Sequence, residues 1–152
     1  MQFICPKHRS QYASATENEL INYCFHWMQE SEKHYKDREW EKVLPYVGSA
    51  YDIANMLIER GGFNRLSLSL MMLSAMYLSN VFHHMGREED ADMVLIFAYN
   101  CLVKNKLTEQ IKTNQALDYA EQLMDEPSHG HVLHSQLNMK LHQRSYQTHA
   151  LH

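Results

Sequence analysis

The sequence predicts an all-helical protein, and three observations support this fold class. Helix breakers are scarce, with 5 Gly and 3 Pro in 152 residues, and good helix formers such as Leu, Met, Ala, Glu and Gln are common. Apolar residues recur with the 3.6-residue period of a helix in several long segments. Gly61-Gly62, Gly86 and Pro127 separate these segments. We therefore expect antiparallel helical hairpins, about five helices in all, followed by a C-terminal tail.

The composition limits the classes of function. A chain of 152 residues with 45% hydrophobic and 21% charged residues is typical of one globular domain. The net charge of −4 argues against nucleic acid as a partner, because phosphate binding needs a basic surface. The three cysteines form no CxxC pair, and MQFICPKHRS has no apolar core of a signal peptide. A cytoplasmic location is therefore expected.

The first long helix is expected from about Glu17 to Lys36. Thr16 and Glu19 have the spacing of a capping box, which marks a helix start. Residues 1–13, which precede it, are expected to form an extended or irregular lead-in.

The second helix is expected from about Glu39 to Arg60. Pro45 lies inside it and would remove one backbone hydrogen bond and bend the helix. The alternative is a start near Leu44, with Trp40 in a loop. We favour the longer helix, because the helical period includes Trp40. Gly61 suits a left-handed cap at its end.

The third helix is expected from about Asn64 to Met85, closed by Gly86. No charged residue occurs from Leu66 to Met85, and this length would span a bilayer. Serine, asparagine and histidine residues interrupt the segment, however. We therefore expect a central, nearly buried helix of a soluble protein and no membrane association.

Two further helices are expected, from Arg87 or Glu88 to Val103 or Lys104, and from about Thr108 to Met124. Pro127 and Gly130 should then break the chain. A weak helix is possible in the tail, from Val132 to Gln143.

The expected organisation is one helical domain over residues 1–126. It contains two helix–turn–helix units, at about 17–60 and 64–104, and a capping helix at 108–124. Residues 127–152 form a histidine-rich C-terminal tail.

An internal repeat appears when the chain is shifted by 48 residues. Trp27 then meets Ala75, and Ser31 meets Ser79. Ala50-Tyr51-Asp52 meets Ala98-Tyr99-Asn100. In each copy, small residues stand where two antiparallel helices would approach closely, and large residues fill the space between them.

This pattern resembles the tetratricopeptide repeat (TPR). The second copy matches well, with Leu78, Ser79, Phe82, Gly86, Ala91, Leu95 and Ala98. The first copy is looser, with Trp27, Ser31, His34, Tyr35, Trp40, Val43, Val47 and Ala50. The resemblance covers about residues 20–104 and implies a right-handed array of helix pairs.

The chain departs from the family pattern at several positions. Arg38 replaces the turn glycine, Glu30 falls where an apolar residue is usual, and Asn55 falls where a proline often ends the unit. The offset of 48 residues also exceeds the family's repeat of about 34. A generic helical bundle is the alternative.

The resemblance also implies a partner-binding groove, lined by the first helix of each repeat. Met and aromatic side chains would suit such an apolar groove. The alternative is that the apolar members are core residues covered by the chain's own N-terminus or tail. The groove positions are Phe25, Met28, Glu32, Tyr35 and Lys36 in the first copy, and Leu73, Met76, Asn80, His83 and His84 in the second.

The stretch HHMGREEDAD, residues 83–92, contains the side chains of a transition-metal site. We interpret it instead as a hairpin turn at Gly86. Histidines suit the C-terminal end of one helix and acids the N-terminal end of the next, because of the helix dipole. Adjacent histidines also point about 100° apart on a helix, so they cannot easily share one ion.

Two other histidine-containing segments are weak metal candidates. The tail holds six of the 11 histidines, and His129, His131 and His134 are the best candidates there. Near the N-terminus, Cys5 and His8 lack two further ligands at a suitable spacing. We expect no cofactor and no bound metal, with a metal-handling role for the tail as the alternative.

No familiar catalytic motif occurs, and Cys24 and Cys101 lie in apolar helical contexts where thiols are inert. We therefore expect a non-enzymatic module that binds another protein, as an adaptor, a regulator or a small chaperone. A homodimer, in which the chain is a structural subunit, is a further alternative.

Overall fold

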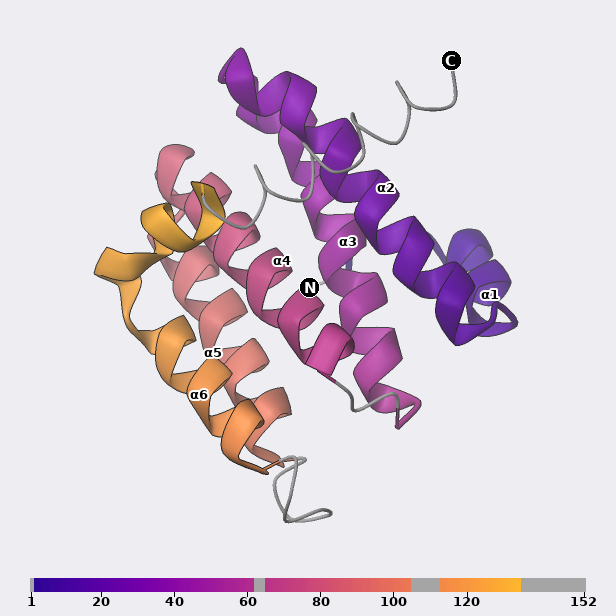
Figure 1. Cartoon of the computed structure of the whole chain (residues 1–152). Coiled ribbons are helices and arrows are strands. Elements are labelled where there is room, and N and C mark those ends of the chain that lie inside the picture. Colours follow the sequence, from indigo (N-terminus) through magenta and orange to yellow (C-terminus); the bar gives the residue numbers. More distant parts are fainter. Residues whose placement is uncertain (1, 62–64, 105–112, 135–152) are drawn as a thin grey trace, which may run out of the picture.

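The chain folds into helices packed side by side (Figure 1), as seen in a computed structural model that describes residues 2–61, 65–104 and 113–134. No strand occurs among these residues, so the expected all-helical class is confirmed. Residues 126–134 are helical as well. The named helices are α1 (Pro6–Ala13), α2 (Glu17–Lys36), α3 (Trp40–Glu59), α4 (Arg65–His84), α5 (Glu88–Lys104) and α6 (Thr113–Met124).

Helix α4 is the centre of the structure. It packs against α3, α5 and α6, and neighbouring helices in the chain also pack on one another: α2 on α3, and α5 on α6. Most of its side chains are buried. It is long and apolar enough to cross a membrane, but 78% of its apolar window is buried inside the protein, as in the core helix of a soluble protein.

The helix ends follow the expected local chemistry. The backbone N–H of Glu19 donates to Thr16 Oγ1 at 3.1 Å, as one half of a capping box requires. Helix α3 begins at Trp40 and continues through Pro45, which confirms the longer of the two alternatives. Gly61 and Gly86 have φ angles of 78° and 73°, as left-handed residues at helix ends.

The two hairpins have the same helix positions. Helix α4 begins and ends 48 residues after α2, and α5 begins 48 residues after α3. The turn residue equivalent to Gly86 is Arg38, which has a φ of 56°. Arg38 therefore adopts the conformation that the glycine adopts in the second copy, at a steric cost that glycine avoids.

The N-terminal expectation is wrong, because residues 6–13 form α1 rather than an irregular lead-in. Pro6 suits the first position of a helix. The guanidinium group of Arg60, at the end of α3, donates to the carbonyl oxygens of Tyr12, Ala13 and Ala15 and so holds the end of α1. These contacts join residues about 45 apart in sequence, so no local sequence pattern predicts them.

Helix α6 ends at Met124 as expected, but Pro127 and Gly130 do not break the chain, because residues 126–134 are helical. Pro127 lies in the first turn of that stretch, where its missing N–H costs little. Leu133 is buried, so the beginning of the expected tail belongs to the folded domain. The remainder of both predicted segments, at 108–112 and 135–143, lies outside the described residues.

Candidate protein-binding surface

The residues of the predicted groove divide into two sets. Met28, Leu73 and Met76 are buried in the core, and Phe25 packs against it. Met28, Leu73 and Met76 are therefore core residues, as the alternative interpretation states, but they lie within the helix packing rather than under the N-terminus or tail alone, and Phe25 is partly buried beside them. They present no open apolar groove in this structure.

The polar members of the predicted groove gather near the turns of the hairpins. The Asn80 side-chain amide donates to the Tyr35 hydroxyl at 2.8 Å. The His84 ring stacks on Trp40, with the ring centroids 4.2 Å apart. Trp40 also contacts Tyr35 edge to face. Sequence reasoning missed Trp40 as a member, because it assigned the groove to the first helix of each hairpin only.

The remaining groove positions make local contacts between polar side chains. Lys36 lies 3.4 Å from Glu32 one turn earlier on α2. His83 Nδ1 contacts the Glu88 carboxylate across the Gly86 turn. This contact between His83 and Glu88 joins the two helices of the hairpin at its turn, as the turn interpretation requires.

The metal candidates do not form a cluster. No group of three His, Cys, Asp or Glu side chains suited to a metal ion exists among the described residues. His129 is buried, and its Nε2 lies 2.8 Å from the Leu123 carbonyl oxygen and 3.2 Å from that of Gln122, where it can cap the end of α6. Cys5 Sγ lies 3.1 Å from His8 Nδ1 as an isolated, exposed pair.

Among the described residues, the largest concentration of exposed, large apolar side chains lies on α5. Met93, Ile96 and Phe97 are 59%, 52% and 46% exposed, and their i, i+3, i+4 spacing places them on one face. We call them the α5 stripe. Sequence reasoning missed it, although the signal was present: residues 93–98 are all apolar, more than a single core-facing stripe needs.

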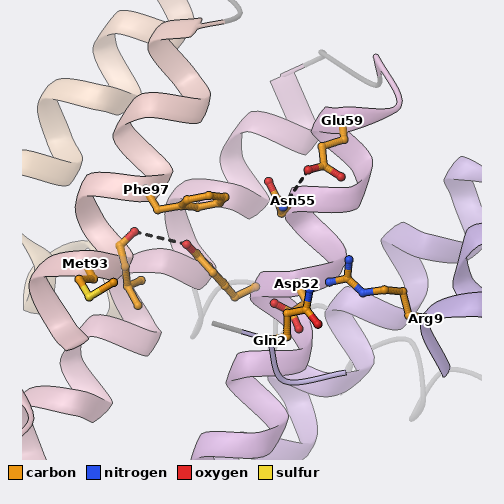
Figure 2. A pocket seen from close by; sticks show the side chains of 9 residues that line it. Gln2, Arg9, Asp52, Asn55, Glu59, Met93 and Phe97 are labelled. Atoms are coloured by element: carbon orange, nitrogen blue, oxygen red, sulfur yellow. Dashed lines mark hydrogen bonds between the residues drawn. The ribbon is translucent and has the colours of Figure 1, made fainter. Parts of the chain in front are cut away.

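The α5 stripe borders a cleft of about 290 Å³ (Figure 2). One wall comes from α5, with Met93 and Phe97. The opposite wall is polar and comes from Asp52, Asn55 and Glu59 of α3. The cleft also contains Gln2, and Arg9 reaches into it from α1, with its side chain directed toward Asp52.

Asp52 is the buried polar residue of this cleft, with 4% of its surface exposed. Its Oδ2 accepts the backbone N–H of Phe3 at 2.6 Å and that of Ile4 at 2.9 Å. Burial raises the pKa of the Asp52 carboxyl, and the two N–H donors and the positive charge of Arg9 partly oppose that rise. The carboxyl therefore anchors the N-terminal segment on α3.

Gly48, one turn before Asp52, completes this anchor. A Cβ at this position would stand 2.2 Å from the Phe3 ring, so only glycine lets the ring lie against α3. Phe3 also approaches Phe82 of α4, with the ring centroids 6.5 Å apart. Residues 2–5 thus cover one part of α3 and form an edge of the cleft.

The arrangement offers apolar contact area, a polar wall and a hollow between them, which are the elements of a recognition surface. Comparisons with known proteins add no assignment: no protein-family model, curated protein or solved structure matches the chain.

Proposed function

We propose that this chain is a non-enzymatic protein-binding module, acting as an adaptor, a regulator or a small chaperone. The observation that carries the proposal is the α5 stripe. Three large apolar side chains about half exposed on one helix face are costly in water, and such patches mark interaction sites. We place the binding surface on α5 rather than on the first helices, because Met28, Leu73 and Met76 are buried.

The environment of one candidate nucleophile agrees with a binding role. Cys24 is buried in the core, and its thiol donates to the Ala50 carbonyl oxygen at 3.4 Å. A thiol held in this way is inaccessible to a substrate.

Site-specific photo-cross-linking tests the proposal. A photoreactive phenylalanine analogue at position 97 of the full chain, activated in cells, should form discrete adducts with another polypeptide. The adducts should disappear when Met93→Glu is added, because a charge in the stripe opposes apolar contact. The same analogue at Met124, an apolar residue on α6 that is also about half exposed, is the control. Equal adducts at both positions, or none at position 97, would contradict the proposal.

A further inference from the structure

Helices α3 and α5 occupy equivalent places in the two hairpins, yet their outer faces differ. Gly48 is the ninth residue of α3 and Ile96 the ninth of α5, and Asp52 and Asn100 are likewise equivalent. On α3 this face is covered by residues 2–5 through Gly48 and Asp52. On α5 the same face, at Ile96 and Asn100, is exposed.

We propose that the open face of α5 binds an extended segment of a partner protein, much as α3 binds residues 2–5. Aliphatic side chains of the segment would contact Ile96 and Phe97. A backbone N–H would be donated to the Asn100 side-chain oxygen, as those of Phe3 and Ile4 are donated to Asp52. This inference rests on the proposed function and specifies its ligand.

The side chain at position 96 defines the shape of the segment. On α3, the absence of a Cβ at Gly48 makes room for the Phe3 ring. On α5, Ile96 fills the corresponding space. The bound segment therefore lies farther from the axis of α5, and aliphatic residues rather than an inserted aromatic ring suit this position.

The charges around the stripe define the flanks of the segment. Glu89 precedes the stripe by one turn, Asp92 lies beside it, and Glu59 lines the cleft across from Phe97; all three are exposed. The chain also has a net charge of −4. Arg9 also lines the cleft, but its side chain is directed toward Asp52, so the acidic side chains beside the stripe favour basic residues at the ends of the segment by charge complementarity.

The chain's own N-terminal segment supports this chemistry. Residues 2–9 contain Phe3 and Ile4, followed by Lys7 and Arg9, and they contain no acidic residue. The extended part, residues 2–5, is apolar at Phe3 and Ile4, and the basic residues Lys7 and Arg9 follow it at the start of α1. Residues 2–5 are bound to α3, so the segment that we propose for α5 is one of a different chain.

Peptide binding by the full-length protein tests the inference. The probe is a fluorescent peptide of alternating valine and threonine, which favours an extended conformation, flanked by lysines. Its matched probe has the same core flanked by glutamates. Anisotropy should show that the lysine-flanked peptide binds at least about tenfold more tightly, and that this preference decreases with salt.

Variants of the full chain then locate the site. Ile96→Glu should weaken binding of the lysine-flanked peptide by at least about tenfold, and Asn100→Ala by a smaller factor. Met124→Glu, which changes an exposed apolar residue on α6, should leave affinity unchanged. Circular dichroism should show the same helical content in all three variants, because the three positions are exposed.

Each contrary result has a distinct meaning. Unchanged affinity in Ile96→Glu overturns the proposed site, and equal affinity for both peptides overturns the proposed chemistry. If the protein sediments as a dimer that Ile96→Glu dissociates, the occupant is a second copy of this chain and the partner segment is wrong. If cross-links form at position 97 while neither peptide binds, the proposed function stands and only this inference fails.

Discussion

The Asp52 anchor supplies a test of how the N-terminal segment is held. Asp52→Ala removes the acceptor of two backbone N–H groups, on Phe3 and Ile4, that are partly or fully buried. Each unsatisfied buried N–H costs about 1–3 kcal/mol. Residues 2–5 can reduce this cost if they detach from α3 and their N–H groups bind water. We expect the free energy of unfolding to fall by about 2–4 kcal/mol.

Asp52→Asn is the matched variant. It keeps a carbonyl oxygen for both donors and removes the buried charge, whose desolvation raises the pKa of this carboxyl. We therefore expect its free energy of unfolding to stay within about 1 kcal/mol of the unchanged protein. Urea unfolding followed by circular dichroism measures both variants, and hydrogen exchange at Phe3 and Ile4 reports detachment of the segment directly.

The outcomes separate two explanations. If Asp52→Asn is as destabilised as Asp52→Ala, the negative charge rather than the acceptor oxygen holds the segment, and the reasoning is refuted. If Asp52→Ala changes neither stability nor exchange, the two hydrogen bonds contribute nothing.

The remaining predictions concern pH and the equivalent positions of the repeat. Because the pKa of Asp52 is raised in the folded protein, its proton is bound more tightly there; the free energy of unfolding should rise as pH falls from that pKa to 3.8, relative to Asp52→Asn measured over the same range. Arg38→Gly should raise the thermal midpoint of unfolding, because a non-glycine residue in the left-handed conformation costs about 1–2 kcal/mol. Glycine removes this cost, and the extra entropy that it gives the unfolded chain offsets only part of the gain. Gly86→Ala should lower the midpoint by the same reasoning. Ser31→Ala should lower the free energy of unfolding, measured in urea, by about 1 kcal/mol, because the hydrogen bond to the Tyr77 hydroxyl is lost. The equivalent Ser79→Ala should be neutral or stabilising, because the Ser79 hydroxyl has no hydrogen-bond partner. Equal effects of the two serine variants, or a lower midpoint for Arg38→Gly, would contradict these expectations.

Local signals in the sequence were sufficient for most of the helices. The capping box at Thr16, the glycine caps at 61 and 86 and the helical period through Pro45 each act within a few residues, so they can be recognised without the fold. The self-comparison detected the two hairpins for a related reason, because both keep the same spacing of helix starts and small residues at equivalent positions. Ala50 and Ala98, for example, are both fully buried.

The N-terminal segment and the binding surface depend on contacts between distant residues, which no local pattern reveals. Helix α1 is held by Arg60, and residues 3 and 4 by Asp52, each more than 40 positions away. The assigned groove included Met28 and Met76 because an apolar helix face looks the same whether another helix or a partner covers it. Only the packing of the helices shows that Met28 and Met76 are covered by neighbouring helices, and that the side chains of the α5 stripe are exposed.

The bond between Ile4 and Asp52 also has a consequence for synthesis of the chain. The two residues are 48 positions apart, so at about 5–20 residues per second Ile4 is made about 2–10 s before its acceptor. Helix α1, with 8 residues, is too short to be stable alone during that interval. Residues 3–13 can therefore take their place only after α3 has been made.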